Sequence, residues 1–166
     1  MEQAAILGFL DRYGLVVVFV LVMLEYMNFP CLPAAVVFPA VGIWTRYTNA
    51  PFSLSLLTSL AAGLVGSAVI YFIGYTGGRK LFDKLCARHK KLNDFFEKYS
   101  EKIRRDQMGT LFIARLLPAV RTLIGFPAGV IRMDFGKYML ASALGIAITN
   151  SFYLIAGMGI GATLVP

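Results

Sequence analysis

Three long apolar stretches in the chain predict helices that span a membrane. They cover residues 4–28, 53–77 and 137–161. A helix needs about 20 mainly apolar residues to cross the hydrocarbon core of a bilayer. The second and third stretches are also rich in glycine, alanine and serine, and small residues let helices pack closely in lipid. The pattern predicts an all-α polytopic membrane protein.

Two further apolar segments are interrupted by proline. Residues 29–45 contain Pro30, Pro33 and Pro39, and residues 108–131 contain Pro118 and Pro127. Proline inside a helix removes a hydrogen bond and clashes with the preceding turn. Such segments predict two opposed re-entrant hairpins, because non-helical backbone at membrane depth is tolerated where it is buried in protein or lines a wet cavity. Gly125 and Gly129 are expected to shape the second hairpin together with its prolines.

Residues 79–107 have a different character, because apolar residues at helical spacing alternate there with charged ones. Ten of the 16 Lys and Arg residues lie between Arg79 and Arg105. The segment predicts an amphipathic helix or helix pair, either on the inner membrane surface or folded against the protein. The positive-inside rule places it in the cytoplasm. With both broken segments counted as hairpins, the N-terminus is expected on the cytoplasmic side and Arg46 outside.

Composition supports one membrane domain over the 166 residues, with 58% hydrophobic and 15% charged residues and a mean hydropathy of +0.70. Soluble domains carry about 25% charged residues. The domain divides into a first half, residues 1–78, and a second half, residues 108–166, joined by residues 79–107. Phe38-Pro39-Ala40 recurs as Phe126-Pro127-Ala128. This recurrence is either a chance match or the trace of inverted-repeat halves. The net charge of +7 does not predict nucleic-acid binding, because no basic, aromatic-interleaved soluble fold accompanies it.

Arg115 and Arg121 are the candidate ligand-binding residues. Each arginine at the centre of a membrane helix costs about 2.5–3.5 kcal/mol on insertion scales. A hairpin bent at Pro118 would bring both guanidiniums toward one cavity, where they suit a phosphate first and a carboxylate second. The alternative is that they reach the interface or pair with Glu25. Glu25 itself is expected to carry protons or to act as a counter-charge.

The apolar segments contain no histidine, and Glu25 is essentially their one carboxylate. Phosphoryl chemistry usually needs a nucleophile or an acidic metal site. We therefore predict no enzyme activity, no catalytic residue, no metal and no cofactor.

These residues also resemble a known family. The pattern Phe112-x-x-Arg115-x-x-Pro118-x-x-Arg121-x-x-x-Gly125-x-x-Ala128-Gly129 is similar to the signature of the DedA family of the SNARE-associated/VTT-domain superfamily. Glu25 with Asn28, Pro30 and Pro33 resembles its first broken segment, and Tyr75-x-x-Gly78-Arg79 resembles a later motif. The resemblance covers about residues 20–160. Acidic residues frequent in the family are replaced here by Ala34-Ala35 and Tyr71, so Glu25 is the remaining candidate for proton coupling.

The resemblance implies a flippase or scramblase of the cell membrane that moves a phosphate-bearing lipid. Its expected cargo is undecaprenyl phosphate or a glycerophospholipid such as phosphatidylethanolamine. The expected partners are membrane lipids with phosphate head groups. Glycine-rich spans pack within one protomer or between protomers, so a monomer and a homo-oligomer are both compatible with the sequence. The rival functions are a lipid-binding assembly protein without transport activity and an ion-coupled transporter of a small anion.

Overall fold

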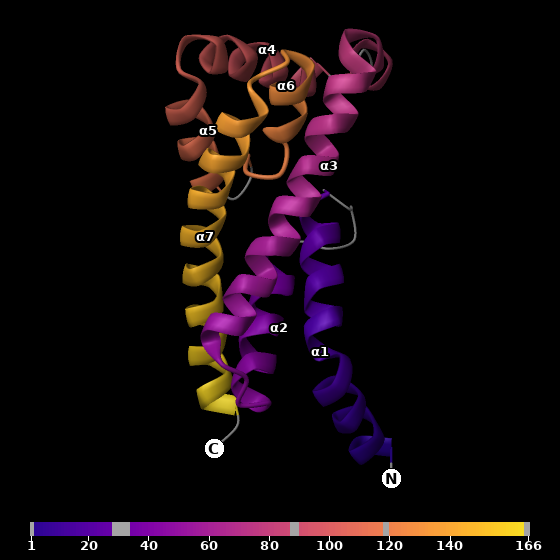
Figure 1. Cartoon of the computed structure of the whole chain (residues 1–166), viewed down its shortest axis with the longest axis vertical. Helices are drawn as coiled ribbons and strands as arrows, with labels where there is room; N and C mark the ends of the chain where they lie inside the picture. The colour runs from indigo at the N-terminus through magenta and orange to yellow at the C-terminus, as the bar shows by residue number, and fades with distance from the viewer. Residues whose placement is uncertain (1, 28–33, 87–89, 118–119, 165–166) are drawn as a thin grey trace.

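The computed structural model describes residues 2–27, 34–86, 90–117 and 120–164. Within these ranges all regular structure is helical and no strand occurs, so the all-α prediction is confirmed. Seven helices follow one another (Figure 1): α1 Glu2–Tyr26, α2 Ala34–Tyr47, α3 Phe52–Cys86, α4 Lys90–Arg105, α5 Gln107–Leu116, α6 Gly125–Val130 and α7 Phe135–Leu164.

Two of these helices are long and apolar enough to cross a membrane. They are α3 over Phe52–Gly78, with 27 residues, and α7 over Phe135–Ala162, with 28 residues. At 1.5 Å per residue each extends about 40 Å, which exceeds the thickness of about 30 Å of the hydrocarbon core. The two helices run in opposite directions along the long axis of the molecule (Figure 1). The spans predicted at 53–77 and 137–161 are therefore helical and of sufficient length.

The placement of the first helix differs from the predicted topology. Helix α1 covers residues 2–26, and Tyr13–Tyr26 is an apolar stretch within it. It begins at the lower end of the molecule, and α2 returns to that same end (Figure 1). The N-terminus therefore lies at the end opposite α4. This placement differs from the expected topology, in which the N-terminus and residues 79–107 share the cytoplasmic side. Which end of the molecule faces the cytoplasm stays a prediction.

Pro39 does not break its segment. It lies inside α2, which continues from Ala34 to Tyr47. The expectation that all three prolines of residues 29–45 interrupt a helix is therefore wrong at this position. Pro30 and Pro33 lie outside the described residues.

The second hairpin begins and ends at the opposite end of the molecule. Helix α5 runs from the α4 end toward the middle, and the chain is back at the α4 end in α6 (Figure 1). Pro127 is the third residue of α6. The first four N–H groups of a helix have no acceptor within the helix, so the missing N–H of a proline costs no hydrogen bond at this position. Gly125 and Gly129 are buried within the same helix. Pro118 lies outside the described residues.

Each hairpin contributes one helix that packs on a long helix of the other half of the chain. The most extensive contact of α2 is with α7, and that of α6 is with α3. Both contacts depend on glycine. A Cβ at Gly42 in α2 would lie 2.7 Å from the Cα of Gly157 in α7, and a Cβ at Gly74 in α3 would lie 2.5 Å from the carbonyl oxygen of Phe126 in α6. Both Phe-Pro-Ala segments thus lie against a glycine of a long helix, Pro39 against Gly157 and Phe126 against Gly74.

The basic segment forms the predicted helix pair. Gly78, with φ of 54°, marks a kink in α3, after which the helix continues to Cys86, and α4 follows across the upper end of the molecule (Figure 1). On α4, Phe96 and Ile103 are buried, whereas Glu97 and Arg104 are exposed. Because α4 contacts α5 and α6, its apolar face is covered by protein rather than left open.

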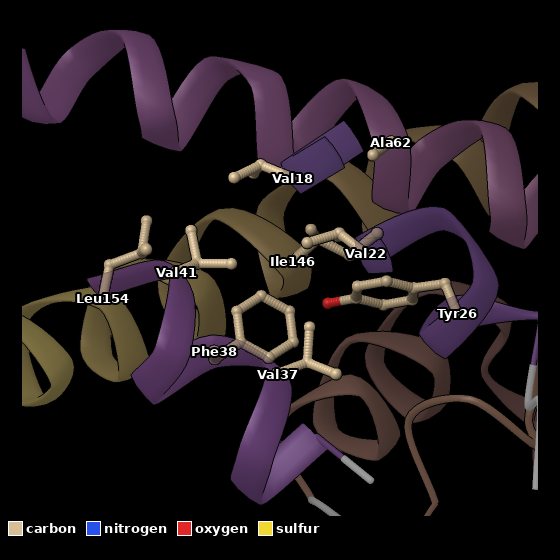
Figure 2. Packing of buried hydrophobic residues seen from close by; sticks show 9 residues of the cluster. All are labelled: Val18, Val22, Tyr26, Val37, Phe38, Val41, Ala62, Ile146 and Leu154. Atoms are coloured by element: carbon tan, nitrogen blue, oxygen red, sulfur yellow. The ribbon is translucent and has the colours of Figure 1, made fainter. Parts of the chain in front are cut away.

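Two large hydrophobic clusters form most of the interior that the structure describes. The first joins α1, α2, α3 and α7 (Figure 2), through Val18, Val22, Tyr26, Val37, Phe38, Val41, Ala62, Ile146 and Leu154. The second surrounds Tyr71 and Tyr138 and includes residues of α5 and α6. Rings from both clusters contact the buried arginines described next, so the apolar interior encloses a polar centre.

Candidate functional site

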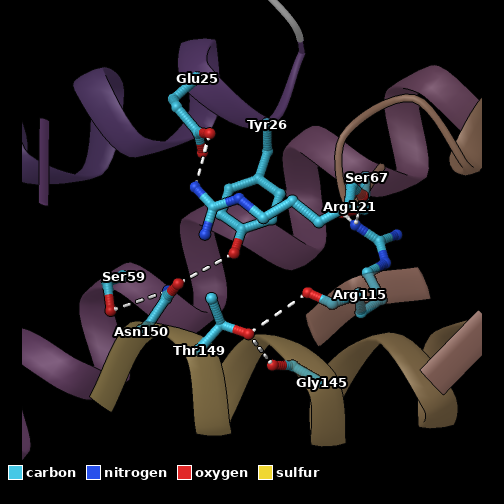
Figure 3. Close-up of polar contacts among 9 residues, drawn as sticks. All are labelled: Glu25, Tyr26, Ser59, Ser67, Arg115, Arg121, Gly145, Thr149 and Asn150. Carbon is cyan, nitrogen blue, oxygen red and sulfur yellow. Dashed lines mark hydrogen bonds and ion pairs between the residues drawn. The ribbon is translucent and has the colours of Figure 1, made fainter. Parts of the chain in front are cut away.

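Arg115 and Arg121 are the two largest fully buried side chains of the part that the structure describes, with exposed fractions of 2% and 0%. Arg115 lies in the last turn of α5, and Arg121 lies in the turn that leads to α6. The structure thus brings both residues into one region. Their guanidiniums, however, point in different directions (Figure 3). The expectation that both face a single cavity is not what the structure shows.

Arg115 is held by four neutral acceptors. Its Nη1 donates to Ser67 Oγ at 3.0 Å and to the carbonyl oxygen of Arg121 at 2.9 Å. Its Nη2 donates to Tyr138 Oη at 2.8 Å and to Ser142 Oγ at 3.0 Å. All four hydrogens of the two terminal nitrogens are thereby used. Arg115 joins α5 to α3, to α7 and to the turn that carries Arg121.

Arg121 has a different environment. Its Nη2 lies 2.6 Å from Glu25 Oε1, and the two side chains are 1% and 3% exposed. Its Nε and Nη1 have no hydrogen-bond partner among the described residues, nor has Glu25 Oε2. The structure thus gives Glu25 the position of a counter-charge, and it leaves Arg121 with N–H donors that no described group accepts. Buried donors of this kind are costly unless something pairs with them.

Three aromatic rings surround the same guanidinium. The Cζ atom of Arg121 lies 5.2 Å from the ring centroid of Tyr26, 4.9 Å from that of Phe38 and 5.5 Å from that of Tyr153. These rings come from α1, α2 and α7. We call Tyr26, Phe38, Tyr153 and the carboxylate of Glu25 the cation cage. Its charge and its ring faces both favour a positive group.

A polar network missed by the sequence interpretation extends from the cage. Tyr26 donates from its hydroxyl to Asn150 Oδ1 at 2.9 Å, and Asn150 Nδ2 donates to Ser59 Oγ at 3.3 Å (Figure 3). Thr149 Oγ1 donates to the carbonyl oxygen of Gly145 at 2.8 Å. The available signal was the presence of such polar side chains within predicted spans, where they are rare and often functional.

A glycine of α7, Gly145, lets α5 approach this helix closely. A Cβ at Gly145 would lie 2.5 Å from Cβ of Arg115, so any larger residue would push α5 away from α7. Thr149, one turn later, also contacts the carbonyl oxygen of Arg115 at 3.3 Å. The backbone of the first arginine is thus positioned by α7.

The charges of the site favour an anion. Two guanidiniums and one carboxylate give an excess of one positive charge if the carboxylate is ionised. In a poorly hydrated interior such an excess attracts a negative group strongly. Within the described ranges, no group of three or more His, Cys, Asp or Glu side chains could hold a metal ion.

Comparison with known proteins indicates the same family as the arginine signature. The VTT domain matches residues 29–159. Undecaprenyl phosphate transporter A of Staphylococcus aureus (strain NCTC 8325 / PS 47) is 26% identical over 95% of this chain and 78% of its own length. An alkaline phosphatase-like protein of Lactococcus lactis subsp. lactis (strain IL1403) is 24% identical over 96% of this chain and 76% of its own.

A third relative is Protein DedA of Escherichia coli (strain K12), which is 30% identical over 80% of this chain and 61% of its own length. No solved structure matches. Because the VTT domain covers most of the chain, from the first proline-broken segment to the last helix, the protein belongs to the VTT-domain (DedA) family of membrane proteins.

Proposed function

We propose that this protein is a lipid transporter that moves a phosphate-bearing lipid across the cytoplasmic membrane, as a flippase or scramblase. The candidate cargoes are undecaprenyl phosphate and glycerophospholipids such as phosphatidylethanolamine. Similarity to two proteins named undecaprenyl phosphate transporter A supports this class of cargo. The proposal includes no enzymatic step.

The observation that carries the proposal is the buried guanidinium of Arg121, whose Nε and Nη1 have no hydrogen-bond partner among the described residues. Moving a phosphate head group out of water without new partners costs many kcal/mol. Charge-assisted hydrogen bonds from a guanidinium replace the lost water, and its planar donors match two phosphate oxygens at once. A buried arginine with free donors is therefore a suitable transient partner for a head group.

The two arginines take different roles in this proposal. Arg121 binds the phosphate directly, because its Nε and Nη1 have no partner in the part of the chain that the structure describes. Arg115 is a positioning residue, because its terminal nitrogens are used by protein groups and one of them bonds to the backbone of Arg121. Glu25 compensates Arg121 when no lipid is bound. A proton on Glu25 would release the arginine to an arriving phosphate.

The arrangement of the helices fits transport from both sides. We propose that α1/α2 and α5/α6 are opposed re-entrant hairpins of inverted-repeat halves, as in many transporters with central sites. Arg121 of the second hairpin contacts Glu25 and Phe38 of the first, so the site lies where the hairpins meet. With α4 on the cytoplasmic face by the positive-inside rule, the ends of α2 and α7 lie at the outer face.

Reconstitution tests the proposal. Purified protein in liposomes should expose an inner-leaflet, fluorescently labelled phospholipid to a membrane-impermeant reductant much faster than empty liposomes do. Arg121→Lys keeps the charge but loses the planar donors, and we expect at least a tenfold fall in rate. Arg105→Lys, at a side chain that is 78% exposed, is the matched control and should keep the parental rate.

The result separates the rival functions. A protein that only binds lipid would show no translocation above empty liposomes. Translocation of both labelled phospholipid and undecaprenyl phosphate at the parental rate by Arg121→Lys would contradict the role assigned to this arginine.

A further inference from the structure

A cleft lies between α4 and the end of α6, at the upper end of the molecule (Figure 1). Its volume is about 300 Å³. One wall comes from α4, through Phe96, Glu97, Ser100, Glu101 and Arg104, and the other comes from the residues that end α6. Neither buried arginine lines it. The cleft is therefore separate from the arginine site.

The hydroxyl of Ser100 indicates that something binds in this cleft. Ser100 is 8% exposed, and its Oγ has no hydrogen-bond partner among the described residues. By contrast, the buried hydroxyls of Ser59, Ser67 and Ser142 each take part in a hydrogen bond. A buried hydroxyl without a partner is unfavourable. A ligand group that bonds to Ser100 would remove this cost.

The charge of the cleft is opposite to that of its helix. Helix α4 carries six Lys or Arg residues and three Asp or Glu residues. Among the described lining residues, however, two are carboxylates and one is a guanidinium, so their formal charge is −1. Glu101 Oε1 accepts a hydrogen bond from Arg105 at 2.5 Å, whereas Glu97 has no ion pair within the described ranges. Glu97 is therefore the carboxylate that can pair with a ligand.

The wall formed by α6 also favours a cation with an apolar part. Val130 is the last residue of α6 and Ile131 follows it. The last carbonyl groups of a helix carry partial negative charge, which attracts positive groups. The side chains of Val130 and Ile131 and the ring of Phe96 are apolar, and a hydrated metal ion gains little from such a surface. An organic cation can use both the charge and the apolar wall.

We propose that this cleft binds a small primary amine as its alkylammonium ion. An ammonium group has three N–H donors and no acceptor, so it can bond to the carboxylate of Glu97 and to the hydroxyl of Ser100 together. Its alkyl chain lies against Phe96 and Val130. Glu97 and Arg104 are exposed, so the ligand enters from water. A ligand in this position joins α4 to α6, and its binding does not depend on transport.

The experiment compares ligands that share one alkyl chain. Purified full-length protein in detergent is titrated with hexylamine hydrochloride, hexan-1-ol or sodium hexanoate, and binding is measured by calorimetry. We expect saturable binding of hexylamine, and affinities for the alcohol and the carboxylate that are lower by about tenfold or more. Magnesium chloride should not displace hexylamine.

Variants of α4 locate the site. Glu97→Gln removes the carboxylate charge and should weaken hexylamine binding about tenfold. Asp94→Asn removes the same charge from an exposed position of α4 outside the cleft, so it is the matched control and should keep the parental affinity. Ser100→Ala should weaken binding without lowering the midpoint of thermal unfolding, because its hydroxyl has no partner to lose among the described residues.

Four results would overturn the inference. Equal affinity for hexan-1-ol would mean that the apolar wall alone binds the chain. Equal weakening by Asp94→Asn and Glu97→Gln would indicate general attraction to a negative helix. Displacement by magnesium would indicate a metal site, and the absence of saturable binding would leave no site at all. None of these results bears on the transport proposal, which depends on Arg121.

Discussion

Arg115 donates a hydrogen bond from Nη1 to the backbone carbonyl oxygen of Arg121 at 2.9 Å. One arginine of the pair therefore fixes the backbone that carries the other. The remaining bonds of Arg115 go to α3 and α7, so the turn between α5 and α6 is tied to both long helices. The two arginines of the signature are not equivalent, and their substitutions should have different consequences.

We expect Arg115→Lys to lower stability more than it changes ligand contacts. Lysine keeps the charge but cannot reach four acceptors in one plane, so Ser67, Tyr138 and Ser142 lose a shared donor. Hydrogen bonds to charged groups contribute about 1.5–3 kcal/mol each, and we expect a loss of about 3 kcal/mol in the free energy of unfolding. Thermal unfolding in detergent measures it. Arg104→Lys, at an exposed position of α4, should leave the midpoint unchanged.

Glu25→Gln should destabilise the protein because it leaves a buried guanidinium without its counter-charge. Removing one partner of a buried pair costs about 3–5 kcal/mol. Adding Arg121→Met to Glu25→Gln should cost less than the sum of the single changes, since both remove one interaction. Glu101→Gln is the matched control, because its pair with Arg105 is exposed and surface pairs contribute about 0–1 kcal/mol. Strict additivity of the two changes would contradict the coupling.

Close packing of α6 on α3 predicts the effect of single methyl groups. A Cβ at Gly129 would collide with the carbonyl oxygen of Tyr71, whereas a Cβ at Gly159 in α7 meets no atom within 4 Å. Gly129→Ala should lower the free energy of unfolding by about 1–3 kcal/mol. Gly159→Ala should be neutral or stabilising by up to about 1 kcal/mol. If both changes altered the free energy of unfolding equally in the same detergent, the contact between α6 and α3 would not be tightly packed.

The start of α3 and helix α4 lie at opposite ends of the molecule, so we expect them to be accessible from opposite sides of the membrane. In a Cys31→Ser/Cys86→Ser background, Ser53→Cys at the start of α3 should react with an impermeant maleimide added to intact cells. Asp94→Cys in α4 should react after lysis alone, because the basic segment is cytoplasmic under the positive-inside rule. Both side chains are exposed in the structure. Labelling of both from the same side would contradict the orientation.

Local patterns predicted the long helices and the basic helix pair, because each depends on residues near in sequence. The first hairpin was predicted less well. The apolar stretch of α1 was interpreted as a full span, but α2 returns to the end of the molecule at which α1 begins. Pro39 was interpreted as a break, but an interior proline is tolerated in α2. Proline is also tolerated in membrane helices where neighbouring groups satisfy the freed backbone.

At the site, too, features that depend on neighbouring residues could be predicted, and contacts between distant segments could not. A bend at Pro118 was expected to bring Arg115 and Arg121 close together, but the sequence left open whether their side chains are buried or reach the interface. The partners that distinguish them could not be predicted, since Ser67, Tyr138 and Ser142 come from helices far away in the sequence. Nothing local indicates which of two arginines a distant carboxylate will meet.

The exchange of packing partners between the halves also determines when the fold is complete. Helix α2 lies on α7 and α6 lies on α3, so the first half cannot cover its own glycine-lined faces. During synthesis α2 and α3 enter the membrane before their partners exist. The contact between α2 and α7 therefore forms only after α7 has been inserted.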